Sequence, residues 1–159
     1  MHTDSEIDII LEAIEHYGKE NQIIVAIEEI SEFLYAILID GNPENIFEEC
    51  IDAQISLLTL KLCGVKFGCK LRHNLTATQA GLNLIKALTK ILRNDTVIIC
   101  EYDLIKEMQR RLDLYLAFYN NERIQSKICS KLKRLKERIN RDSSNSNYNF
   151  YMRRFMAQE

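Results

Sequence analysis

The sequence predicts an all-α protein. Only one proline and five glycines occur in 159 residues, and long stretches run without a turn signal. Apolar residues recur instead at intervals of three and four, which is the periodicity of an amphipathic helix. A chain of this length, with 47% hydrophobic and 28% charged residues, is sufficient for one domain with a substantial core. We therefore expect a bundle of about six helices in a single domain over residues 1–141.

The first helix is expected to begin at Thr3 or Asp4 and to end at Gly18. Thr3 and Glu6 have the spacing of a capping box, in which each side chain accepts a hydrogen bond from the backbone N–H of the other residue. Isoleucine, leucine and tyrosine residues then recur at helical intervals as far as Tyr17. Gly18 supplies the stop signal.

The next two helices are expected to form an antiparallel hairpin over residues 21–63. The first of them runs from about Asn21 to Ile39, and the following sequence, Asp-Gly-Asn-Pro, is a dense turn signal. The second begins near Pro43, because proline is favoured in the first turn of a helix, and it continues to Cys63.

The second half of the chain resembles a degenerate repeat of this hairpin over residues 76–120. Thr76 can cap a helix that ends at Leu92, and a further helix is expected after a turn at 93–96 and to end around Asn120. FLYAI aligns with LIKAL at an offset of 51 residues, and LLTLKL aligns with LYLAFY at an offset of 57. The alternative is that any two amphipathic helices align this well.

The end of the chain is expected to contain a basic helix and a flexible tail. The helix spans about 122–140 and carries lysine and arginine against few acidic residues. Residues 142–159 begin with a polar linker, DSSNSN, and continue with aromatic residues and arginine, so the tail is a candidate lid over a bound ligand. A solvated helix and a disordered tail are the alternative.

Composition excludes several classes of protein. The net charge of −2 gives no global signal for nucleic acid or a membrane surface, and we expect neither partner. The apolar run 23–39 contains three glutamates, which are costly in hydrocarbon, so it does not predict a membrane span. The start of the chain lacks the pattern of a signal peptide. Five cysteines without a Cys-x-x-Cys spacing predict free thiols in a reducing, cytoplasmic setting.

Two pairs of acidic residues form the candidate functional site. Glu29 and Glu32 are three apart on one helix of the hairpin, and Glu49 and Asp52 are three apart on the other, so each pair shares a helix face. Reversal of the chain at 40–41 places Glu32 level with Glu49. It also places Glu29 level with Asp52.

The surroundings of these carboxylates point to a metal. The face that carries Glu29 and Glu32 also contains Val25, Ala36 and Ile39, so this helix is expected to be buried. Clustered, partly buried carboxylates repel one another unless a cation compensates them. Hard oxygen ligands at this density suit Mg²⁺, which typically takes its remaining ligands from water and substrate phosphates.

The same residues carry a family resemblance. The run EEISE, followed after a short loop by EECID, resembles the Glu-Glu-x-x-Glu and Glu-x-x-Asp signature of the all-α nucleoside triphosphate pyrophosphohydrolases. This superfamily contains the MazG-like proteins and the dimeric dUTPases. HYGKENQIIVAI and KLKRLKERI are similar to flanking segments of small phage and bacterial MazG-like proteins. These segments together cover under half of the chain.

The resemblance implies a MazG-like bundle and a set of site residues. In it Glu29, Glu32, Glu49 and Asp52 bind Mg²⁺, with Mn²⁺ as a substitute. The ions hold a nucleoside triphosphate, expected to be a deoxynucleotide, and help water to attack between the α- and β-phosphates. Glu28 matches the first acid of the motif and is a candidate to orient or deprotonate that water, with a surface role as the alternative. The candidates for binding phosphate are Lys131 and Arg134, which correspond to basic positions of the family.

The repeat departs from the family pattern. Positions that correspond to the four acidic ligands hold no acidic pair, being Ala80, Asn83, Lys106 and Gln109. A second metal site is therefore not expected. The repeat is expected to serve as scaffold, so the chain is either a homodimer or an internal pseudo-dimer. Glu107, beside these positions, is expected to tolerate replacement by glutamine.

Two other functions remain open at this point. The same fold can bind and sequester a nucleotide without hydrolysing it. Alternatively, the chain is a helical interaction protein that works through its basic helix and tail. Pyrophosphate release that depends on Mg²⁺ separates the enzyme from both.

Overall fold

The computed structural model describes residues 2–93 and 100–144, and these residues confirm the all-α prediction. Apart from an isolated pairing between Lys70 and Tyr102, the described residues form no strand. The helices are α1 (Asp4–Tyr17), α2 (Lys19–Tyr35), the π-helical turn η1 (Ala36–Asp40), α3 (Pro43–Leu62), α4 (Ala77–Leu92), α5 (Leu104–Leu116) and α6 (Asn121–Ser144).

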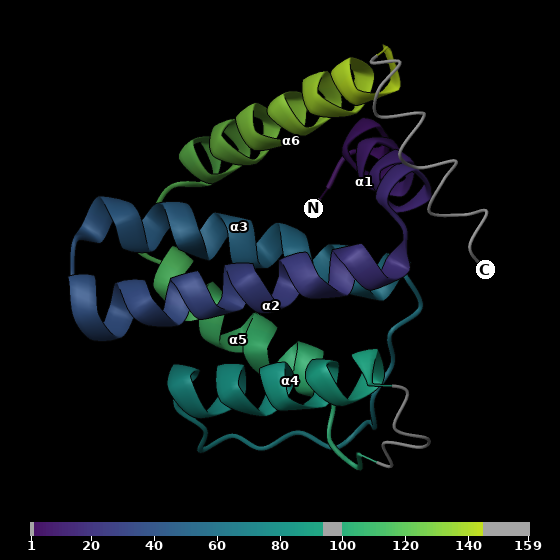
Figure 1. Cartoon of the computed structure of the whole chain (residues 1–159). Helices are drawn as coiled ribbons and strands as arrows, with labels where there is room; N and C mark the ends of the chain where they lie inside the picture. Colours follow the sequence, from purple (N-terminus) through teal and green to yellow (C-terminus); the bar gives the residue numbers. More distant parts are fainter. Residues whose placement is uncertain (1, 94–99, 145–159) are drawn as a thin grey trace.

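The hairpin of α2 and α3 lies at the centre of the molecule (Figure 1). On one side, α4 packs against α2, and α5 packs against α3 and α4. On the opposite side, α6 packs against α1 and α3 (Figure 1). The hairpin that carries the candidate site therefore has helices on both sides.

Local sequence signals explain the start of the hairpin and its turn. Gly18 ends α1 with a φ of 86°, a left-handed value that a side chain would disfavour, and α2 begins at the next residue. At the other end of α2, Gly41 has a φ of 69° and reverses the chain. Asn42 then caps α3, because its side chain accepts hydrogen bonds from the backbone N–H groups of Glu44 and Asn45.

The core extends across the bundle and contains buried residues of every helix from α1 to α6. Its largest fully buried side chains come from α1 to α5: Ile10, Ile23, Ile30, Phe33, Phe47, Ile51, Leu57, Leu60, Leu84, Leu88, Met108 and Leu112. Helix α4 approaches α2 closely at Gly81, where an added Cβ would lie 2.9 Å from the Leu34 side chain. The pairing of α4 with α2 and of α5 with α3 is the arrangement that an internal duplication of the hairpin would produce.

A buried ion pair anchors the connection between α3 and α4. The backbone N–H and the guanidinium Nε of Arg72 donate to Oε1 of Glu107 at 3.0 Å each, and Nη2 donates to Oε2 at 2.9 Å. Only 2% of the Glu107 side chain is exposed. The expectation that Glu107 tolerates replacement by glutamine therefore does not fit the structure, because its carboxylate holds Arg72 in place.

The final helix is longer than the sequence predicts. Helix α5 ends at Leu116, before the expected Asn120, while α6 extends to Ser144 and includes the first three residues of the expected linker. The last turn of α6 is held to α1 by the Tyr17 hydroxyl, which donates to Asp142 Oδ2 at 2.8 Å. The expected turn at 94–96 and the tail beyond Ser144 lie outside the described residues. None of the described helices is both long and apolar enough to cross a membrane.

Candidate metal centre

Three of the four predicted carboxylates converge between α2 and α3. Glu29, Glu32 and Glu49 each offer one oxygen, and these oxygens all lie within 4.8 Å of one another. The antiparallel packing of the hairpin produces this convergence, since Glu32 and Glu49 lie at similar distances along the chain from the turn at Gly41. Three carboxylate oxygens at this spacing form a geometry that a single divalent cation can bridge.

The group lacks a compensating positive charge of its own. Burial, together with the charges of Asp52, Glu32 and Glu49, raises the pKa of Glu29 to about 7. Burial and the neighbouring Glu32 likewise raise the pKa of Glu49. The Oε2 atom of Glu49 is buried without a hydrogen-bond partner. A buried carboxylate oxygen without a partner is costly, and a bound cation would remove that cost.

The site is more open than the sequence predicts. Ala36 is fully buried as expected, but 38% of Val25 and 68% of Ile39 are exposed. Glu32 is exposed as well, whereas Glu29 and Glu49 are half-buried. The expectation of a buried face is wrong at its two ends because Val25 borders a cavity and Ile39 lies at the hairpin turn. Solvent and a ligand therefore have access to the carboxylates.

Asp52 differs from the other three carboxylates in having a cationic partner. Its Oδ2 lies 2.5 Å from the ammonium nitrogen of Lys131 on α6, which also lies 3.1 Å from Glu48 Oε2. Burial by itself lowers the pKa of Lys131, but the hydrogen bonds to Asp52 and Glu48 outweigh it and raise the pKa. The predicted square of four carboxylates is thus a group of three beside an ion pair.

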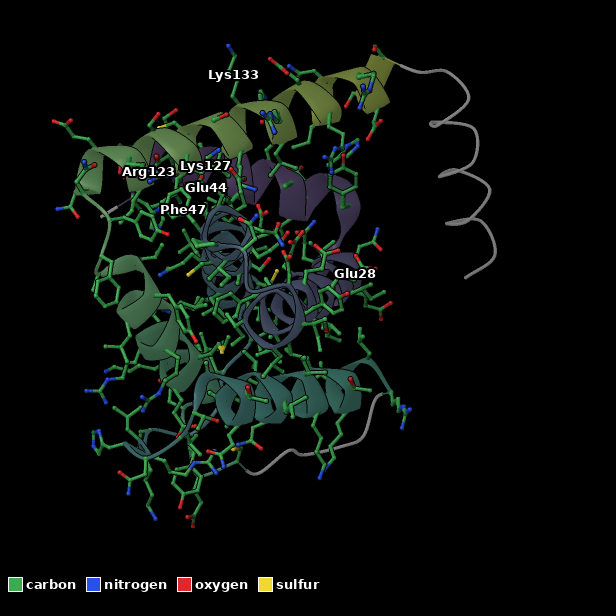
Figure 2. All side chains as sticks on the ribbon, turned by 90° about the vertical axis from the view of Figure 1, so that its left-hand side faces the viewer. Glu28, Glu44, Phe47, Arg123, Lys127 and Lys133 are labelled. Carbon is green, nitrogen blue, oxygen red and sulfur yellow. The ribbon has the colours of Figure 1, made fainter. Side chains whose placement is uncertain are left out.

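This ion pair belongs to a row of charges that joins α3 to α6. Acidic residues on α3 face basic residues on α6 at successive helical turns, and their pairs are Glu44 with Arg123, Glu48 with Lys127, and Glu48 and Asp52 with Lys131. Figure 2 shows the start of this row, where α6 meets α3. There the Arg123 guanidinium also lies over the Phe47 ring, 4.7 Å from its centroid.

A cavity of about 330 Å³ adjoins the carboxylates, in the size range of a small-molecule site. It is bounded by α1, α2, α3 and α6, and Glu29 and Asp52 are the carboxylates at its edge on the hairpin. Beyond Asp52, α3 presents Ile55, Ser56 and Thr59 and no further acid. The α6 wall contains Lys131 and Arg138 with two leucines between them, and it ends at Asp142, which accepts from the Tyr17 hydroxyl. Beyond Asp52 the cavity is thus lined by one cation and one carboxylate of α6, and the carboxylate is already hydrogen-bonded to α1.

The other predicted residues have different positions. Glu28 is exposed on α2 and does not belong to the converging group (Figure 2). Arg134 is exposed and does not line the cavity, whereas Lys131 does. Sequence reasoning missed Arg138. Arg138 follows Lys131 by seven residues, about two helical turns, and therefore lies on the same face of the helix. This spacing could have identified Arg138 as a second candidate for binding phosphate.

The cavity combines carboxylates for a metal, cations for an anionic group, and apolar and amide side chains for a larger organic moiety. Such a combination is chemically suited to a ligand that carries phosphates at one end. No protein-family model, no curated protein and no solved structure matches the chain.

Proposed function

We propose that the protein is a Mg²⁺-dependent nucleoside triphosphate pyrophosphohydrolase that releases a nucleoside monophosphate and pyrophosphate. A deoxynucleoside triphosphate is the expected substrate, and Mn²⁺ is expected to substitute for Mg²⁺. The observation that carries the proposal is the convergence of Glu29, Glu32 and Glu49 beside a cavity that also contains Lys131 and Arg138.

The residues of the group fit a hard divalent cation. The buried oxygen of Glu49 has no partner, and the pKa of Glu29 is raised by burial and by its acidic neighbours. A cation bound among these carboxylates would relieve both features. Mg²⁺ accepts carboxylate oxygens and completes its coordination with water and phosphate oxygens. Asp52, at the edge of the same cavity, is the remaining candidate ligand.

A divalent ion held by Glu29, Glu32 and Glu49 would offset charge on the phosphate oxygens and would lower the pKa of the attacking water. The chain itself contributes the remaining interactions. Lys131 and Arg138 contact the phosphates, which carry more negative charge than one divalent ion offsets. Asn21, Gln22 and the apolar wall of the cavity hold the nucleoside. Glu28 remains the candidate to orient the water because it matches the first acid of the family motif, although it is exposed on α2 and does not line the cavity.

We also propose that one chain supplies the scaffold that a dimer supplies in simpler proteins of this kind. The support is that α4 and α5 pack on the α2–α3 hairpin, and that the repeat has no acidic pair at the positions that correspond to the metal ligands.

We propose a cytoplasmic location as well. All five cysteines are free thiols, which is typical of proteins in a reducing compartment.

A screen of nucleoside triphosphates for pyrophosphate release, with Mg²⁺ and with a chelator, tests the proposal. Ribose, deoxyribose and noncanonical bases are all included, because cavity shape rather than the metal site selects the base. We expect Mg²⁺-dependent release with at least one deoxynucleotide. Tight nucleotide binding without release would instead indicate a sequestering protein. An interaction protein would show neither release nor stabilisation by metal.

A further inference from the structure

Asp52 is a candidate ligand of the proposed metal, and it already forms an ion pair with Lys131. Lys131 comes from α6, 79 residues further along the chain, and its ammonium nitrogen lies 2.5 Å from Asp52 Oδ2. Only 16% of the Lys131 side chain is exposed. The other three carboxylates have no comparable cation: none of the ion pairs among the described residues involves Glu29, Glu32 or Glu49.

An ammonium group and a divalent ion compete for the same oxygen. A metal on Asp52 Oδ2 would use the lone pairs that accept from Lys131, and a divalent ion on either oxygen of Asp52 would repel the adjacent ammonium group. Glu48 is the second partner of Lys131, but Lys127 already pairs with it. Full engagement of Asp52 by metal therefore requires Lys131 to find another anion.

The cavity provides a place for that anion. Lys131 lines it together with Arg138, and the flexible four-carbon stem of lysine allows the ammonium group to move while α6 stays in place. A phosphate group bound between these two cations would satisfy Lys131 in place of Asp52. Asp52 would then be free at the edge of the same cavity, next to Glu29.

We infer that Lys131 is an exchangeable counter-ion, which holds Asp52 in the free protein and transfers to the polyphosphate of the substrate when it binds. The inference rests on the proposed function. Its consequence is that metal and nucleotide bind cooperatively, because each ligand removes one partner from the Asp52–Lys131 pair. Lys131 is a positioning residue for the metal and a contact residue for the substrate.

The test measures two affinities of the full-length protein, and replacement of Lys131 is expected to change them in opposite directions. The first is the affinity for Mn²⁺ alone, and the second is the affinity for an α,β-imido deoxynucleoside triphosphate of the base identified by the screen, at saturating Mn²⁺. Lys131→Met should bind Mn²⁺ alone about five- to tenfold more tightly than the wild type, within the usual range of site coupling. The same variant should bind the analogue about tenfold more weakly, because it lacks the phosphate contact.

Matched variants separate exchange from a structural role. Lys136→Met removes another cation of α6, one that pairs with Glu12 on α1 and does not line the cavity, so both affinities should equal those of the wild type. Lys131→Arg keeps the charge and should retain weak Mn²⁺ binding. Lys131→Gln, whose amide can still donate to Asp52, replaces the methionine variant if that variant does not fold.

Two results would overturn the inference. If Lys131→Met binds Mn²⁺ no more tightly than the wild type while pyrophosphate release by the wild type is intact, Lys131 does not compete with the metal and the proposed function stands. If the wild type binds neither Mn²⁺ nor the analogue and releases no pyrophosphate, the proposed function fails and the inference fails with it.

Discussion

At the residue scale, the candidate site is defined by charges that are only partly compensated. Spacing predicted that Glu29, Glu32 and Glu49 come together, because helical periodicity and the position of one turn fix which faces of a hairpin meet. Spacing did not predict that Asp52 is held by Lys131, since this contact depends on how α6 docks, 79 residues away. The same limit explains why Glu107 was misjudged, whereas the spacing of Arg138 from Lys131 was readable in the sequence.

Removal of any one of the four carboxylates is expected to abolish activity without loss of the fold. Glu29→Gln, Glu32→Gln, Glu49→Gln and Asp52→Asn should each lower Mg²⁺-dependent pyrophosphate release by about 100-fold or more. Circular dichroism should stay helical, because removing a carboxylate also removes repulsion. Glu20→Gln, an exposed residue of α2, is the control and should retain activity. Wild-type turnover by a Glu32→Gln/Asp52→Asn double variant would rule out the assignment of these ligands.

The raised pKa of Glu29 predicts a difference in stability that depends on pH. Its pKa is about 7 in the folded protein and near 4.5 in the unfolded chain, so between these values the folded state binds more protons. Without metal, ionisation of Glu29 therefore destabilises the fold as the pH rises through this window. Glu29→Gln lacks this effect and should gain stability relative to the wild type between pH 5 and pH 8. Chemical unfolding in the presence of a chelator measures this difference, and a difference that does not change with pH would contradict the prediction.

At the element scale, helix starts were predictable and long-range anchors were not. The capping box of Thr3 and Glu6 and that of Thr76 and Gln79 are both formed, since a cap depends on residues three apart in sequence. The end of α6 was placed too early because the contact between Asp142 and Tyr17 joins residues 125 positions apart. Polar composition indicated a linker there, and tertiary contact extended the helix.

The Glu107–Arg72 pair should stabilise the fold measurably. Glu107→Gln leaves Arg72 without its charged partner in a mostly buried setting and should lower the free energy of unfolding by about 2 kcal/mol, the scale of hydrogen bonds to charged groups. Glu101→Gln is the matched control, because Glu101 pairs with Lys70 at a surface where both side chains are more than half exposed. Its effect should stay within about 0.5 kcal/mol. Equal effects of the two substitutions in urea unfolding would show that burial does not strengthen the Arg72 pair.

At the scale of the whole molecule, the two hairpins have different tasks. The first carries the converging carboxylates, and the second packs against it without an equivalent acidic group among the described residues. The sequence predicted this asymmetry from Ala80, Asn83, Lys106 and Gln109, since ligand chemistry is readable from residue type alone. The cavity was not predictable, because its walls come from four helices that meet only in the folded chain.

The proposed metal site has a thermodynamic consequence for the whole fold. A divalent ion that binds only the folded state raises the midpoint of thermal unfolding. Mn²⁺ should therefore raise the midpoint of the wild type, and Glu49→Gln should lose most of this rise. Lys106→Gln, a change at the corresponding face of the second hairpin, should keep the full rise. A loss of the Mn²⁺ effect in Lys106→Gln would place the ion elsewhere.

The most direct test of the proposed activity is an analysis of products by ³¹P nuclear magnetic resonance after incubation of the protein with a deoxynucleoside triphosphate and Mg²⁺. The proposed function predicts equal amounts of nucleoside monophosphate and pyrophosphate, formed by the wild type and not by the Glu32→Gln/Asp52→Asn variant. Nucleoside diphosphate with orthophosphate, or an unchanged triphosphate for every base tested, would contradict the proposed function.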